Sequence, residues 1–196
     1  MIRSRNRPSR RLAARAAALA AIAAFAPAMA GCGINAIPTQ EENARAKWAD
    51  VEAQYQRRAD LIPNLVATVQ AAAIAERGTL TEVIEARARA TGITITPETL
   101  NDPAAMQRYQ QAQGELGQAL SRLLLVVEQY PQVASNANFI ALQTQIEGTE
   151  NRIGVARRDY NEAARAYNTT LRIFPTVIWA KTVHGGSRPL PLFEAA

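Results

Sequence analysis

Residues 139–174 read FIALQTQIEGTENRIGVARRDYNEAARAYNTTLRIF, and their apolar pattern is the strongest structural signal in the chain. Apolar and small residues recur at alternating spacings of three and four, as in a helix that buries one stripe. At about 1.5 Å per residue, this segment predicts one helix roughly 50 Å long. Ser135 or Asn136 can cap its start, and Pro175 should end it because proline disfavours helix at the preceding residue. The stripe comprises Phe139, Leu142, Ile146, Thr149, Ile153, Ala156, Tyr160, Ala163, Tyr167, Thr170 and Phe174.

Two further heptad stripes precede this one. Residues 106–130 carry one of them, and Asp102 is placed to cap that helix before a proline at the first helical position. The other stripe runs through residues 48–73 and crosses Pro63 without losing register. It predicts either one helix kinked at Pro63 or a second helix that Asp60 caps.

These stripes predict an all-α protein, an antiparallel up-and-down four-helix bundle with long helices over residues 41–175. Three long helices are the alternative if Gly78 does not break the chain. Residues 32–40 are expected to form a linker, and residues 176–196 an irregular apolar tail. In residues 91–101 an Ile/Thr alternation could make a strand, but the sequence offers it no partner. An even number of helices would return residue 175 to the end where the bundle begins.

The basic residues of the chain are concentrated at its start. Of 22 Lys and Arg, six lie before Cys32, which leaves 16 against 17 Asp and Glu, a net charge of −1 for the body. The pI near 9.9 therefore belongs to the leader, and we expect no nucleic-acid binding by the body.

The leader resembles a secretory signal. Its arginines are followed at residues 16–30 by the apolar run AAALAAIAAFAPAMA, so residues 1–31 are predicted to be a signal peptide. The body would then belong to the cell envelope and face the periplasm or the exterior. An uncleaved transmembrane helix is the alternative, although the run is short and contains Pro27.

The junction after the leader predicts a lipid anchor. Met29-Ala30-Gly31-Cys32 resembles a bacterial lipobox, in which the cysteine is acylated, for instance with palmitate, and becomes the new N-terminus. Cys32 is thus the predicted lipidation site, and the membrane is a predicted partner. The alternative is an ordinary cleavage site at Ala28-Met29-Ala30, with Cys32 incidental.

The residue inventory excludes the common catalytic constellations. The chain has one Cys and one His, His184, so neither a Cys/His zinc site nor a Ser-His-Asp arrangement in the core can be assembled. We expect no catalytic residues, no metal and no cofactor. Two pairs of carboxylates at i,i+3 could hold a metal through oxygen alone, but pairing with arginines such as Arg89 is simpler. The pairs are Glu82 with Glu85 and Glu147 with Glu150.

A set of short motifs is spread over residues 41–195. They are RRADLIPNLV at 57–66, EARA at 85–88, YP at 130–131, NF at 138–139, TENRI at 149–153, RRDYN at 157–161, YN at 167–168 and FP at 174–175. Together they resemble the LemA family. The resemblance implies an antiparallel four-helix bundle held at a membrane by its N-terminus, without an established enzymatic activity. The lipobox-like Cys32 departs from the plain transmembrane helix with which many relatives begin.

Seven polar residues of these motifs lie beside the apolar stripes. One interpretation is an internal network that fixes the register of the helices, and the other is a recognition site in which arginines bind a carboxylate or phosphate. Asp60 and Asn64 could also satisfy backbone groups freed by Pro63. The seven are Arg57, Arg58, Asp60, Asn64, Glu150, Arg152 and Asn161.

The segment after Pro175 is the candidate membrane contact. Residues 176–181 combine aliphatic residues with Trp179 and Lys181, which is typical of a membrane-interface segment. The alternative is that this segment folds back and caps the end of the bundle. In either case we expect Trp179 at the same end as residue 41.

The function predicted from these features is a non-catalytic, membrane-tethered helical scaffold or adaptor. Its long helices would offer a surface to a protein partner or for self-association. One alternative is a bundle that binds a lipid or small ligand between its helices. A less favoured alternative is an enzyme with an all-carboxylate metal site.

Overall fold

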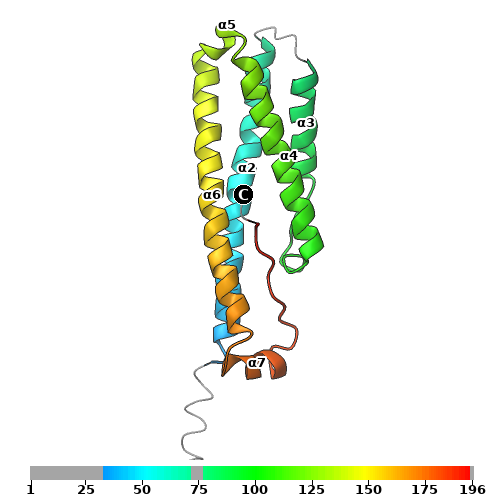
Figure 1. The fold of residues 1–196 in the computed structure, drawn as a ribbon, viewed down its shortest axis with the longest axis vertical. Helices are drawn as coiled ribbons and strands as arrows, with labels where there is room; N and C mark the ends of the chain where they lie inside the picture. Colours follow the sequence, from blue (N-terminus) through cyan, green and yellow to red (C-terminus); the bar gives the residue numbers. More distant parts are fainter. Residues whose placement is uncertain (1–32, 72–76, 195–196) are drawn as a thin grey trace, which may run out of the picture.

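The computed structural model describes residues 33–71 and 77–194, and in this part of the chain all regular structure is helical (Figure 1). The predicted all-α class is therefore confirmed. Cys32 and the leader lie outside the described residues. The four long helices are α2 (Ala36–Ala71), α3 (Arg77–Thr91), α4 (Pro103–Val127) and α6 (Ala137–Thr170), and the two short ones are α5 (Pro131–Ala134) and α7 (Thr176–Thr182).

The four long helices differ in length, so they do not all pack along the whole bundle. α2 and α6 have 36 and 34 residues and run side by side along their whole length, whereas α3 has 15 and α4 has 25 (Figure 1). At about 1.5 Å per residue, α3 covers less than half of the α2–α6 pair. α7 lies across the end where α2 begins, which we call the base. The segment after α7 runs back from the base along the bundle.

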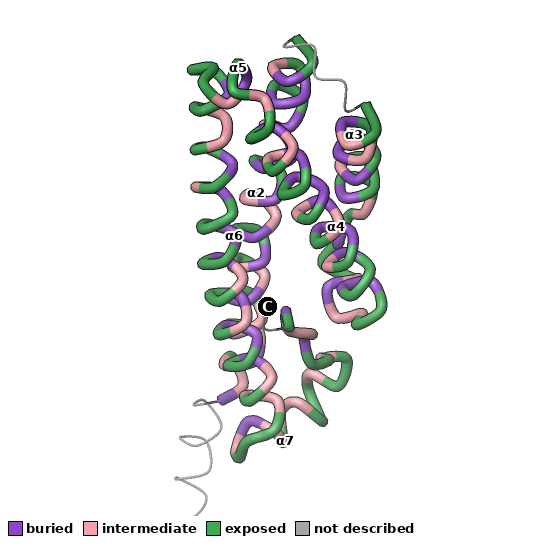
Figure 2. The backbone as a smooth tube through the Cα atoms, turned by 45° about the horizontal axis from the view of Figure 1, so that its top comes forward, coloured by how far each residue is buried: buried purple, intermediate pink, exposed green. Residues whose placement is uncertain are grey.

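The buried side chains form two clusters. Figure 2 colours the backbone by burial, and buried positions alternate with exposed ones along each long helix. The base cluster centres on Trp48, whose ring meets those of Tyr109 and Tyr160 edge to face, each at 5.4 Å between centroids. Phe193 from the C-terminal segment stacks on Trp48 at 5.8 Å. The upper cluster joins α3 to the other long helices, for example through Val83, and its large, most deeply buried members include Ile62, Leu65, Leu116 and Leu123.

The predicted starts of two helices are confirmed. Asp102 caps α4 by accepting from the backbone N–H of Ala104 at 2.9 Å, with Pro103 at the first helical position. Asn136, not Ser135, caps α6, because its side-chain oxygen accepts from the N–H groups of the second and third residues of the helix. Both caps satisfy N–H groups that have no partner within the helix.

The predicted end of the last helix is wrong by four residues. α6 ends at Thr170, and Phe174, expected in the buried stripe, is 74% exposed. Pro175 disfavours helical backbone before it. The Thr176 hydroxyl donates to the carbonyl oxygens of Thr170 at 2.5 Å and Ile173 at 3.0 Å, which closes the helix end.

The structure also corrects the expected linker and tail. α2 begins at Ala36, so the last five residues of the expected linker 32–40 are helical. α2 continues through Pro63, so the chain does not start a second helix capped by Asp60. Residues 176–196 are not an irregular tail over their described part, because they hold α7 and an extended segment that contributes Leu190 and Phe193 to the base cluster.

Candidate functional site

The base of the bundle joins α7 to the start of α2. Gly33, the first described residue, is buried, and a Cβ built on it would lie 3.4 Å from atoms of both Thr176 and Trp179. His184 Nε2 lies 3.1 Å from the carbonyl oxygen of Ile34. The expected position of Trp179, at the end where the bundle begins, is therefore confirmed. Trp179 is partly buried against the base cluster, so α7 also caps this end.

The C-terminal part of the base, residues 172–188, carries exposed apolar and basic side chains, while Glu41 of α2 lines a pocket with Arg188 and His184. Of the eight exposed large hydrophobic side chains in the described residues, four lie between residues 173 and 183. The exposed Arg172, Lys181 and Arg188 flank them, and residues 172–188 include no acid. We call the four side chains the base patch; they are Ile173 (50% exposed), Phe174 (74%), Ile178 (48%) and Val183 (55%).

A buried arginine joins the four long helices. Arg58 of α2 is 2% exposed, and its guanidinium donates to Glu150 Oε1 of α6 at 2.7 Å. It also donates to the side-chain and backbone oxygens of Gln113 of α4, at 2.7 and 3.0 Å. Gln113 in turn donates to the carbonyl oxygen of Ala90 of α3 at 3.3 Å, and the guanidinium lies 5.1 Å from the centroid of the Tyr55 ring. We call Arg58, Gln113 and Glu150 the central joint.

The other predicted polar residues do not belong to this joint. Arg57, Arg152 and Asn64 are exposed. Asp60 is also exposed and accepts from Gln56 one turn earlier at 2.7 Å. Asn161 binds the C-terminal segment. Of the seven residues, the structure thus brings together only Arg58 and Glu150. The sequence alone does not single out Gln113, because its place in the heptad stripe of residues 106–130 is that of an ordinary core position.

The backbone group freed by Pro63 has a different partner from the expected one. Without an N–H, Pro63 cannot bond to the carbonyl of the residue four positions earlier, Ala59. Arg87 of α3 donates to that carbonyl through Nε at 2.8 Å. The expectation that Asp60 and Asn64 serve this purpose is therefore replaced by an arginine from the neighbouring helix.

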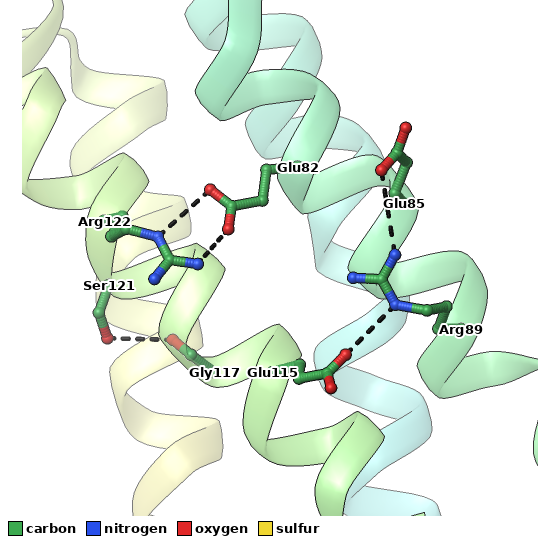
Figure 3. A network of polar contacts seen from close by, with 7 residues as sticks. All are labelled: Glu82, Glu85, Arg89, Glu115, Gly117, Ser121 and Arg122. Atoms are coloured by element: carbon green, nitrogen blue, oxygen red, sulfur yellow. Dashed lines mark hydrogen bonds and ion pairs between the residues drawn. The ribbon is translucent and has the colours of Figure 1, made fainter.

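The carboxylates of α3 are paired with arginines on the surface (Figure 3). Arg122 of α4 forms a two-pronged contact with Glu82, and Arg89 lies between Glu85 and Glu115 at 3.9 and 3.3 Å. The expected pairing of Glu85 with Arg89 is confirmed. Such exposed pairs add little stability. In the described ranges no group of three or more His, Cys, Asp or Glu could hold a metal ion.

A groove of about 880 Å³ separates part of α4 from α6. Gly114 and Gly117 line it on the α4 side, together with larger residues such as Leu120. Ile146 and Glu150 line it on the α6 side. The solvent-facing part of Glu150 thus lies in this groove, while its other side meets Arg58.

The fold and these contacts define a class of protein: a long antiparallel helical bundle with a buried polar joint and with exposed apolar and basic side chains at its base. The chain belongs to the LemA family, whose family model matches residues 47–196. It is also similar to the magnetosome protein MamQ of Magnetospirillum gryphiswaldense and to MamQ 1 and MamQ 2 of Paramagnetospirillum magneticum. Each is 31% identical over 160 residues, which cover 72% of this chain and 58% of the relative.

The chain thus spans less than two thirds of the length of these relatives. Neither the description of the family nor the names of the relatives includes a catalytic activity. Among the helices of the described residues, none is long and apolar enough to span a membrane.

Proposed function

We propose that this chain is a non-catalytic helical scaffold or adaptor of the cell envelope, moored to a membrane at its base and acting by contact. In this proposal residues 1–31 direct export and Cys32 carries the lipid. The body then faces the periplasm or the exterior, and its polar helix faces are available to protein partners or to further copies.

The observation that carries the proposal is the coincidence of two features at the base. The base patch lies on the same end of the bundle as Gly33, where the leader joins the described chain. A bundle anchored through the preceding residues would therefore bring the patch against the lipid headgroups. Apolar side chains flanked by Lys and Arg are the composition of a surface that binds such an interface.

The basic residues of segment 172–188 fit an anionic lipid surface. Arg172, Lys181 and Arg188 are exposed and no acid lies between them in the sequence. Each basic residue near an anionic membrane contributes about 1 kcal/mol at physiological ionic strength. Three such charges and four apolar side chains would hold the base flat on the membrane once the anchor has brought it there.

Fluorescence quenching tests this contact. The full chain, with Trp48→Phe so that Trp179 is its only tryptophan, is reconstituted into vesicles whose acyl chains carry bromine. We expect strong quenching of Trp179. The matched control moves the tryptophan to the far end of the bundle, with Trp179→Phe and Leu125→Trp, and should show almost no quenching. Equal quenching at both positions would refute membrane contact by the base.

Mass spectrometry of the mature N-terminus tests the anchor separately. We expect a chain that begins with Cys32 and carries acyl groups, and Cys32→Ser should abolish the added mass. A mature chain that begins beyond Cys32 and carries no lipid would contradict the proposed mooring.

A further inference from the structure

The C-terminal segment 190–194 is bound to the bundle as an extended peptide is bound to a receptor. Asn168 of α6 donates to the carbonyl oxygen of Leu190 at 2.8 Å and accepts from its N–H at 2.7 Å. Asn161 does the same for Phe193, donating at 3.0 Å and accepting at 2.8 Å. Each asparagine side chain thus donates one hydrogen bond to the main chain of a single tail residue and accepts one from it. An adjacent β-strand would offer that residue the same two bonds.

The spacing of these two clamps matches an extended chain. Asn161 and Asn168 are seven residues apart on one helix face, which is about 10.5 Å along the axis. Leu190 and Phe193 are three residues apart, which is about 10 Å in an extended backbone. The segment therefore lies antiparallel to α6 without strain in its register.

The remaining carbonyl oxygens of the segment are also bound. Pro191 accepts from the Tyr160 hydroxyl at 3.0 Å, Leu192 from Gln110 at 3.4 Å, and Glu194 from Arg157 at 3.1 Å. Five consecutive carbonyls, from residue 190 to residue 194, thus each accept a hydrogen bond from a bundle side chain. Recognition of the main chain is the mode by which proteins bind extended peptides.

Two buried anchors complete this site. Leu190 is 7% exposed and Phe193 is 4% exposed, and both belong to the base cluster. The Arg157 guanidinium lies 4.7 Å from the centroid of the Phe193 ring. We call the surface of Gln110, Tyr160, Asn161 and Asn168 that holds the segment the peptide groove.

The link that carries the segment into the groove is exposed and rich in glycine. Residues 184–189 are mostly exposed, and Gly186 has open space around its Cα. His184 is held near Ile34 at the base, so the link begins there. Six extended residues span about 20 Å.

We propose that the peptide groove also accepts residues 190–194 of a second copy of this chain, so that two copies exchange their tails. The segment that fits the groove is part of this chain, so every further copy carries it. If two copies exchange their tails about a two-fold axis, each groove binds the tail of the other copy through the same contacts that it makes with its own tail. The links start at the base. Two copies moored on one membrane, as proposed above, would therefore have their links at the same distance from the membrane.

Co-purification of complementary variants tests the exchange. One full-length variant, Asn161→Ala with Asn168→Ala, has a damaged groove and an intact tail. The other, Leu190→Ser with Phe193→Ser, has a damaged tail and an intact groove. With a different affinity tag on each and purification in detergent, we expect the complementary pair to be recovered in about equal amounts. Pairs of the same variant are the matched controls and should be recovered only at background.

Equal recovery of all pairs, or none of the complementary pair from folded variants, would overturn the proposal. Because the measurement is made in detergent, it is independent of the membrane contact proposed above. Circular dichroism establishes that both variants fold.

A second measurement avoids the damaged variants. A protease site inserted between Gly185 and Gly186 of the full chain allows the tail to be cut after folding. A labelled peptide of residues 187–196 should then bind the cut protein, and the same peptide with Phe193→Ser should not. Failure of the wild-type peptide to bind would overturn the site itself. Binding of the peptide without co-purification of the complementary variants would overturn the second copy as its ligand.

Discussion

Pro63 and Arg87 show how one residue can depend on another from a different helix. Pro63 removes a hydrogen bond inside α2, and Arg87 of α3 donates to the carbonyl left open at Ala59, which is 2% exposed. A buried carbonyl without a donor costs about 1–3 kcal/mol. The proline is therefore tolerated in mid-helix because α3 is docked beside it.

This dependence predicts a coupling between the two residues. Arg87→Met should lower the free energy of unfolding by about 1–2 kcal/mol, because Ala59 loses its donor. In a Pro63→Ala background the residue at 63 regains an N–H for Ala59, and Arg87→Met should then cost much less. Urea unfolding of the four proteins measures the coupling. Equal costs in both backgrounds would show that Arg87 acts in some other way.

Because Tyr160 is buried, we expect the free energy of unfolding to fall at alkaline pH. Burial raises the pKa of Tyr160 well above its ordinary value, which is about 10. The unfolded chain then loses this proton at a lower pH than the folded chain does. Its contribution to stability is complete below about pH 10 and is lost as the pH rises beyond that. Burial also raises the pKa of Tyr109, which adds to the effect.

The test compares unfolding of the wild type and Tyr160→Phe between pH 8 and pH 11.5. The free energy of unfolding of the wild type should fall above pH 10. That of the variant should fall less steeply, with a slope that is smaller by up to about 1.4 kcal/mol per pH unit. The variant also loses the bond to Pro191, but that shifts its curve without changing the slope. If the free energies of unfolding of the two proteins fell in parallel with pH, the raised pKa of the buried Tyr160 would be contradicted.

At the scale of the elements, the central joint is where all four long helices meet. Gln113 lies 7% exposed in the α4 stripe and serves both the Arg58 guanidinium and the Ala90 carbonyl. An arginine buried among helices is costly when one of its acceptors is removed. The joint therefore fixes how the α3–α4 pair sits on α2 and α6.

Gln113→Leu should destabilise the protein by about 2–3 kcal/mol, because Arg58 loses a charged hydrogen bond. Combining it with Arg58→Met removes the buried charge as well, so the double variant should be less destabilised than the sum of the two single variants. Urea unfolding followed by circular dichroism measures all three. Gln111→Leu, on the exposed face of α4, is the control and should change stability by less than about 0.5 kcal/mol. An additive double variant would show that Gln113 and Arg58 are not energetically linked.

The sequence predicts elements better than it predicts their partners. Heptad periodicity and the cap at Asp102 identify the long helices, because these signals are local. The pairing of Arg87 with Ala59 depends on how α3 docks, which no local pattern contains. The C-terminal segment was missed for the same reason. Its contacts come from Asn161 and Asn168, which lie more than 20 residues earlier in the chain.

At the scale of the whole molecule, α2 and α6 pass through both clusters of the core. The base cluster is completed by the C-terminal segment, and the upper cluster by α3. Unfolding either cluster would expose part of the same two long helices. This continuity predicts that the bundle unfolds as one cooperative unit although its core has two centres.

A substitution in each cluster tests this unity. Phe193→Ala in the base cluster and Leu116→Ala in the upper cluster should each cost about 2–5 kcal/mol, since both remove a buried side chain. In a Trp179→Phe background, the fluorescence of Trp48 reports on the base cluster and circular dichroism reports on all helices. The two signals should change together in both variants, because neither half of the α2–α6 pair can lose its partner alone. If Trp48 fluorescence of the Phe193→Ala variant changed at a lower urea concentration than the circular dichroism, the base would be a separate unit. Departure of the tail would then open the base without unfolding the upper bundle.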